Sequence, residues 1–200
     1  MSHTVNSMQL MLRICDRFAD EFDVKFNCQK SIATRVGVRF NVNCGLLQLA
    51  NKNISYVTEF KYLGVHVVSA RTLKFSVDHL RVKFYRMFNQ VYSKSKSARS
   101  EIVTVELMKV YCLPFLLYAT EATLLSSTCI NMLENCINRA LYKIFGRCDN
   151  YDAVQFKQFL GLNSVCQLIE ERRNRFVGRL MSSDRFITLL CVSTCDDMFT

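Results

Sequence analysis

The first twenty-two residues place large apolar side chains three or four positions apart. This spacing predicts an amphipathic helix that is capped by Asn6 or Ser7 and runs to about Glu21. Its apolar positions are Met8, Met11, Leu12, Cys15, Phe18, Ala19 and Phe22. Because the acidic residues lie off this stripe, we expect the helix to pack on one side only.

After residue 24 the pattern changes to short extended runs separated by Asn, Lys and Gly clusters. The runs are residues 24–27, 33–40, 46–50, 54–57 and 60–67. All are short, and all except 46–50 are rich in β-branched or aromatic residues, which is typical of strands. They predict a small antiparallel sheet behind the single helix.

Beyond residue 69 the spacing is helical again, and a long basic helix is predicted over residues 71–99. One face of it is apolar, with Leu73, Val77, Leu80, Phe84, Met87 and Val91. Further helices are predicted at 101–112, from Ser126 or Ser127 to Phe145, at 151–161 and at 164–183. Pro114 starts a new helix or kinks one, and Gly146 ends the helix before it. The fold class is therefore expected to be α+β.

The composition is that of a packed globular protein. Half of the 200 residues are hydrophobic and only one is proline, which argues against disorder. Ten cysteines without a CxxC pair or a signal peptide favour reduced thiols inside the cell. The longest apolar run, 113–125, is short for a membrane span of about 20 residues and contains Glu121. We expect a cytoplasmic or nuclear protein that is neither secreted nor inserted in a membrane.

The net charge of +9 favours a polyanionic partner, nucleic acid first and an anionic membrane surface second. The excess is local, because residues 71–99 hold eight Lys or Arg and one acidic residue, Asp78. Attachment of this helix to a membrane surface is the weaker reading, since its apolar face is needed for packing.

Metal ligation has little support in the sequence. Asp16, Asp20 and Asp23 are either a solvated helix face or carboxylates one turn apart that hold a metal, and we expect the former. Cys191 and Cys195 are two potential ligands where a structural zinc site needs four. No metal site is predicted in this chain.

Three segments follow one another in an informative order. F-N-x-x-K-S spans 26–31, Y-L-G-V spans 62–65, and L-P-x-L-L-Y-x-x-E spans 113–121. Together they resemble the fourth and fifth palm motifs, and the segment after the first thumb helix, of reverse transcriptases of non-LTR (LINE-type) retrotransposons. The resemblance covers most of the chain. It implies a palm remnant at 1–69, a thumb-like helical region at 70–148 and a C-terminal helical segment at 149–200.

The resemblance implies a role for the hairpin. Tyr62, Leu63 and Gly64 would form the primer grip, in which glycine lets the backbone approach the sugar-phosphate at the primer's 3′ end. The alternative is an ordinary buried hairpin with Gly64 at a bulge. Lys30 would lie near the phosphates of the incoming nucleotide. Its alternative is a surface lysine after a strand.

The basic helix resembles the thumb, which grips the template-primer duplex through its phosphates and without sequence preference. The residues implied are Lys74, Arg81, Lys83, Arg86, Lys94 and Lys96. The expected partners are an RNA–DNA hybrid or a duplex, and the palm and fingers of the parent enzyme.

Phosphoryl transfer in this family needs aspartates that hold two Mg²⁺ ions, and the Y-A-D-D motif that supplies them is not in these 200 residues. Residues 2–12 resemble the stretch that follows that motif, so we expect the chain to begin just downstream of its active site. Asp196 and Asp197 are expected to be a polar tail. The chain alone is predicted to be inactive as an RNA-directed DNA polymerase and to hold no cofactor, with Mg²⁺ expected in the complete enzyme. The alternative function is a helical protein–protein interaction module with no nucleic-acid role.

Overall fold

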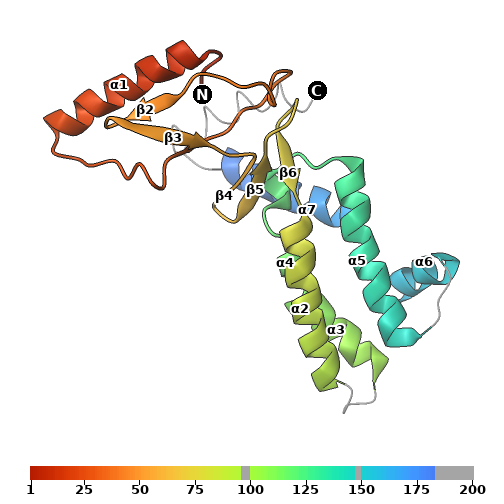
Figure 1. Ribbon diagram of the computed structural model, residues 1–200. Coiled ribbons are helices and arrows are strands. Elements are labelled where there is room, and N and C mark those ends of the chain that lie inside the picture. Colours follow the sequence, from red (N-terminus) through yellow and green to blue (C-terminus); the bar gives the residue numbers. More distant parts are fainter. Residues whose placement is uncertain (96–99, 147–149, 183–200) are drawn as a thin grey trace. The chain divides into compact units, whose positions relative to one another are not determined.

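A computed structural model describes residues 1–95, 100–146 and 150–182 of the protein (Figure 1). Helices and short strands are both present, and the predicted α+β class is confirmed. The chain divides into two compact units, Met1–Phe75 and the residues from Ser76 onward. We call them the N-terminal unit and the helical unit.

The N-terminal unit begins with α1 (Val5–Glu21), which lies on a three-stranded sheet (Figure 1). The strand order is β1 (Ile32–Ala33), β3 (Lys52–Tyr56) and β2 (Leu47–Leu49), and β1 runs parallel to β3. A second sheet contains β4 (Glu59–Tyr62), β5 (Val65–Val68) and β6 (Lys74–Ser76). The predicted small sheet is therefore divided in two, and one of its strand pairs is parallel.

Polar side chains of α1 fix it on the sheet. The amide of Gln9 donates to the Gln48 carbonyl and accepts from the Gln48 N–H, at 2.9 and 2.8 Å. Asp16 accepts from the N–H of Ala50, in the turn between β2 and β3, at 2.9 Å. Thr4 caps the helix by accepting from the Ser7 N–H at 3.1 Å, so the predicted cap at Asn6 or Ser7 was wrong by two or three residues.

The apolar stripe predicted for α1 is in fact two stripes. Met8, Leu12 and Cys15 are half-buried against the sheet, next to buried Leu47, Leu49 and Ile54. A second row is exposed, and it consists of Leu10, Met11, Ile14, Phe18 and Phe22. Helical spacing alone did not separate the two rows, because residues three and four apart belong to both.

Two predicted strands do not form. Residues 24–27 instead follow the end of α1, where the Val24 N–H donates to the Ala19 carbonyl. In the run 33–40, pairing stops after Ala33 and the chain turns at Gly37, whose φ is +129°.

The predicted helix at 71–99 begins only at Asp78. Lys74–Ser76 forms β6, and Leu73 is exposed, although it was expected on the buried face. Leu73, Phe75 and Val77 also fit the two-residue period of a strand, which explains the error. Asp78 suits the first turn of a helix, where a negative charge is favourable.

The helical unit contains α2 (Asp78–Ser95), α3 (Glu101–Tyr111), α4 (Leu113–Leu116), η2 (Thr120–Ala122), α5 (Ser127–Phe145), α6 (Asn150–Phe159) and α7 (Val165–Met181). The predicted helices after residue 100 are confirmed. Pro114 lies in the first turn of α4, Ser126 caps α5, and Gly146 ends α5 with a φ of +87°. The core includes Phe84, Phe88, Met108, Leu116, Leu133, Ile137 and Leu141.

No single helix in the described ranges is long and apolar enough to cross a membrane. One pair of consecutive helical segments, bent by 40°, has the length and composition of a membrane span, and it consists of Glu101–Tyr111 and Leu113–Ala122. Val105, Met108 and Leu116 of this pair are buried in the core of the unit.

The cysteines of the described residues are free thiols. Burial raises the pKa of the Cys112 thiol to about 11, which makes it a poor nucleophile at neutral pH. Cys191 and Cys195 lie outside the described residues, as do Asp196 and Asp197.

One carboxylate joins three helices of the helical unit. Glu134 of α5 accepts from the Lys157 ammonium of α6 and, at 2.7 Å, from the Val165 N–H at the start of α7. The Glu134 and Lys157 side chains are only 24% and 12% exposed. The pair therefore has little competition from water.

We expect Glu134→Ala to lower the free energy of unfolding by about 2 kcal/mol, because it leaves a buried ammonium and a backbone N–H without their acceptor. Urea unfolding followed by circular dichroism measures this. The control is Glu106→Ala, which removes the exposed partner of Lys109 and should cost about 0.5 kcal/mol. Equal losses for both variants would contradict the anchoring role.

Candidate nucleic-acid interface

The residues that the sequence singled out lie in both units. In the N-terminal unit they are Lys30, Tyr62, Leu63, Gly64 and Lys74. In the helical unit they are Arg81, Lys83, Arg86 and Lys94. Lys96 lies outside the described residues.

The segment Y-L-G-V forms the end of a tight hairpin. Tyr62 pairs with Val65 across the two strands, so only Leu63 and Gly64 make the turn. Their φ angles are +46° and +85°, and positive values at both central residues define a type I′ turn. Gly64 is therefore a turn residue and does not sit at a bulge.

The tip of this hairpin is strained and exposed. Leucine is unfavourable at positive φ because its β-carbon crowds the backbone. Asn or Gly is the usual choice at this position of a type I′ turn. Leu63 is 76% exposed and Tyr62 is 65% exposed. The tip thus presents two large side chains to solvent at a cost in backbone energy, and burial in the unit's own core does not offset this cost.

The base of the hairpin is held by polar contacts. The Nδ1 atom of His66 lies 2.9 Å from the Glu59 carboxylate across the strand pair. The Ser69 hydroxyl donates to the Arg35 carbonyl at 2.7 Å. Lys61 faces His66 across the strands and is exposed, as is Lys74 on β6. Sequence reasoning missed Lys61, although it directly precedes the Y-L-G-V motif.

Lys30 lies in a tight turn and is exposed. Its N–H donates to the Asn27 carbonyl at 3.1 Å, and Ser31 closes the same turn. A shallow hollow of about 360 Å³ is lined by the neighbouring residues 25–29 and by Lys52. This lining contains two lysines, Lys25 and Lys52, and no carboxylate. Lys30 does not line it, so the anion-binding potential here lies with two lysines that sequence reasoning missed.

The helix α2 separates apolar and cationic side chains. Leu80, Phe84 and Phe88 are buried, and Phe84 and Phe88 stack with centroids 6.0 Å apart. Three exposed cations lie together on another side of the helix, and they are Lys83, Arg86 and Lys94. At 1.5 Å per residue they span about 16 Å. We call these three residues the cationic row.

Two further cations border α2 in different ways. Arg81 lies about 200° around the helix from Lys83, and its guanidinium donates to Asp78 at 2.8 Å. It is therefore already engaged in an ion pair away from the cationic row. Lys143 of α5 donates to Asn89 at 2.9 Å and lies 5.1 Å from the ring centroid of Tyr92. Its approach to α2 depends on tertiary packing and had no signal in the sequence.

No group of three or more His, Cys, Asp or Glu within the described ranges is arranged to hold a metal ion. Comparison with known protein families, with curated proteins and with solved structures gave no match.

We expect Leu63→Asn to raise the free energy of unfolding of the N-terminal unit by about 1 kcal/mol, because asparagine tolerates positive φ. Thermal unfolding followed by circular dichroism in the strand region measures the shift. Leu73→Asn is the control, since Leu73 is another exposed leucine and has no positive φ. A loss of stability in Leu63→Asn beyond that of the control would show that the leucine side chain stabilises the turn.

Proposed function

We propose that the protein binds duplex nucleic acid, either an RNA–DNA hybrid or a DNA duplex, through its phosphates and without sequence preference. In this proposal it is a fragment of a non-LTR retrotransposon reverse transcriptase that keeps primer-grip and thumb elements. The observation that carries the proposal is the cationic row on α2, which lies on a different side of the helix from the buried Phe84 and Phe88. The sequence motifs support it independently.

Two of the three cations in the row, Lys83 and Arg86, are well placed to bind a polyanion. Lys83 and Arg86 form no ion pair with any carboxylate in the described part of the chain. Their side chains are exposed, so phosphate binding requires no rearrangement of the core. Each phosphate that such a cation neutralises releases a condensed counterion, which makes binding salt-dependent and insensitive to base sequence.

The hairpin tip supplies a different kind of contact. The exposed Tyr62 ring can stack on a base or pack on a sugar, and such stacking is tolerant of sequence. Leu63 keeps an apolar side chain at the tip despite the unfavourable φ. Strain of this kind is often found where a residue contacts a ligand, which supports a binding role for the tip.

In this proposal the chain binds and orients its ligand and does not catalyse. The carboxylates that hold Mg²⁺ in the family belong to the Y-A-D-D motif, which these 200 residues lack. The chemistry would be supplied by the palm and fingers of the complete enzyme.

The triple variant Lys83→Gln, Arg86→Gln, Lys94→Gln tests the proposal. We expect the slope of log K against log salt to become less steep by about 3, because about 0.9 counterion is released per phosphate contact. At about 0.1 M salt the affinity for a hybrid duplex should fall by about tenfold or more. Fluorescence anisotropy with a labelled duplex at several salt concentrations measures both.

The matched control is Arg139→Gln, Arg175→Gln, Arg179→Gln, which removes three exposed charges of α5 and α7 from the same unit. It should leave the slope nearly unchanged. If both triple variants weaken binding equally, net charge alone is responsible and the cationic row is not a binding site. Binding by the native protein that does not depend on salt would contradict the proposal itself.

A further inference from the structure

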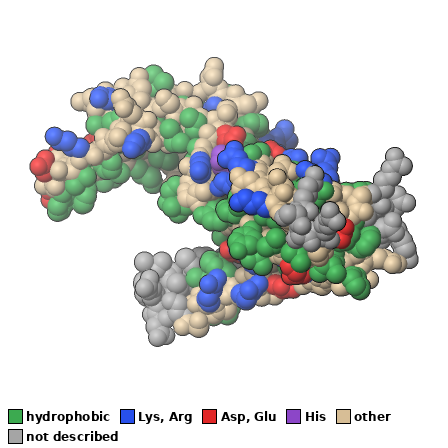
Figure 2. All heavy atoms as spheres, turned by 90° about the horizontal axis from the view of Figure 1, so that it is seen from below, with side chains coloured by type: hydrophobic (Ala, Val, Ile, Leu, Met, Phe, Trp, Pro, Cys, Tyr) green, Lys and Arg blue, Asp and Glu red, His purple; other side chains and the backbone are tan. Residues whose placement is uncertain are grey.

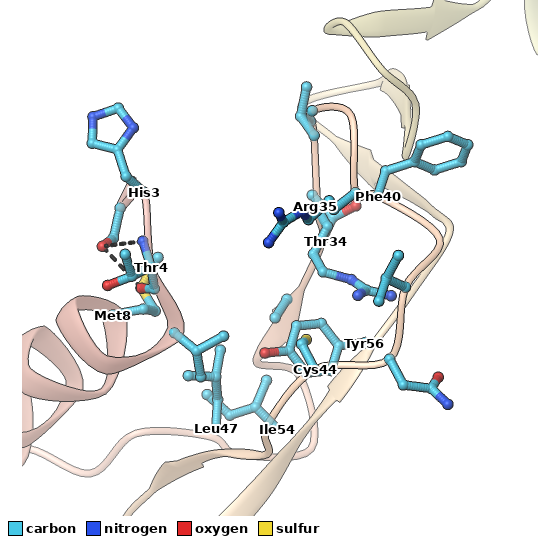
Figure 3. A pocket seen from close by; sticks show the side chains of 18 of the residues that line it. His3, Thr4, Met8, Thr34, Arg35, Phe40, Cys44, Leu47, Ile54 and Tyr56 are labelled. Carbon is cyan, nitrogen blue, oxygen red and sulfur yellow. Dashed lines mark hydrogen bonds between the residues drawn. The ribbon is translucent and has the colours of Figure 1, made fainter.

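The N-terminal unit contains an open cleft of about 740 Å³ beside α1 (Figure 3). Met8 and Leu12 of α1 form one wall, and residues 34–44 form the opposite wall. Leu47 and Ile54 of the sheet lie between them and give the cleft an apolar floor. All lining residues belong to this one unit.

The charge of the cleft is one-sided. Its lining includes Arg35, Arg39 and His3, and no Asp or Glu. Neither arginine forms an ion pair with a carboxylate among the residues that the structure describes. Within the described part of the chain, these two guanidinium groups therefore have no acidic partner at the cleft.

Arg35 is held in position from two sides. Its guanidinium lies 5.2 Å from the ring centroid of Tyr56, within the range of a cation–π contact, and its carbonyl accepts from Ser69. Tyr56 is fixed in turn by donating to the Gly45 carbonyl at 3.1 Å. Burial, and then a hydrogen bond with Cys44, raise the pKa of Tyr56 to about 12, so its hydroxyl stays neutral. Tyr56 therefore adds no negative charge beside Arg35 at neutral pH.

A two-residue edge strand lines the same cleft. Ile32 and Ala33 of β1 line the cleft. Within the described residues β1 pairs with β3 on one side only, so it is an edge strand of its sheet. The other edge of an outer strand presents backbone N–H and C=O groups that an extended peptide can pair with. A small anion could satisfy the arginines, but it could not use this edge.

We propose that the cleft binds an extended polypeptide segment that carries both apolar and acidic side chains. The segment pairs with the free edge of β1, places its apolar side chains on Leu47 and Ile54, and places its carboxylates on Arg35 and Arg39. This site is separate from the cationic row on α2 and does not depend on the proposed nucleic-acid function.

The second stripe of α1 favours a polypeptide over a smaller ligand. Leu10, Ile14 and Phe22 are 58%, 51% and 57% exposed, and Phe18 stacks on Phe22 with centroids 4.4 Å apart. Hydrophobic side chains gather along this part of the unit, at the left of Figure 2. Apolar surface on two sides of one helix is typical of a helix that is covered on both. A partner that fills the cleft can extend over this stripe, whereas a small molecule cannot.

The test is selection from a random library of twelve-residue peptides against the full chain. We expect enriched peptides to alternate apolar residues with Asp or Glu. The affinity of an enriched peptide should fall about tenfold for Arg35→Gln, Arg39→Gln, since two charge-assisted contacts are lost. The matched variant Arg13→Gln, Arg17→Gln removes two exposed charges of α1 that do not line the cleft, and it should change affinity less than about twofold.

Arg39→Gln alone is included because Arg39 is exposed and Arg35 also packs on Tyr56. An intermediate loss for this variant supports the proposal even if the double variant unfolds. Four outcomes would each overturn the proposal. They are no enrichment above bare matrix, enriched peptides without carboxylates, equal losses in both double variants, and displacement of the peptide by duplex nucleic acid. Duplex binding by Arg35→Gln, Arg39→Gln should keep the native salt slope, so the two proposals fail separately.

Discussion

Burial of the aromatic side of α2 is the constraint on which the candidate interface depends. Phe84 and Phe88 are 0% and 1% exposed, and each contributes about 2 to 3 kcal/mol when removed from water. Rotating the helix by one residue, about 100°, would expose these rings and move charged side chains towards the core. The orientation of Lys83, Arg86 and Lys94 is thus fixed by packing, and the surface charge follows from the core.

Glu134 of the helical unit and Leu63 of the hairpin have opposite effects on stability. The Glu134 carboxylate joins three helices, and its partial burial strengthens each hydrogen bond that it accepts. Leu63 adopts a left-handed conformation and gains no burial from it. The two positions therefore differ in whether burial accompanies the local energetic cost.

Local signals in the sequence predicted the helical unit well. Ser126, Pro114 and Gly146 act on the backbone next to them, so they fix where helices start and end whatever the tertiary context. Residues 73–77 fit the helix period and the strand period equally, and pairing of β6 beside β5 decided between them. Spacing along α2 predicted an apolar face that includes Leu80 and Phe84, and both are buried. It did not separate Arg81, which pairs with Asp78 at i, i+3, from the other cations. The cleft could not be predicted, because its walls come from residues 2–12, 32–44 and 47–56, which are brought together only by folding.

The two units differ in how much apolar surface each buries in its own core. The buried cluster of the helical unit includes side chains from α2, α3, α4, α5 and α7. In the N-terminal unit the buried cluster is Leu47, Leu49 and Ile54, and half-buried residues surround it. A small sheet covered by one helix has little apolar burial to offset chain entropy. Any segment that binds the native cleft stabilises this unit by mass action. The cationic row, in contrast, lies on a helix that the larger core of the helical unit already holds in place.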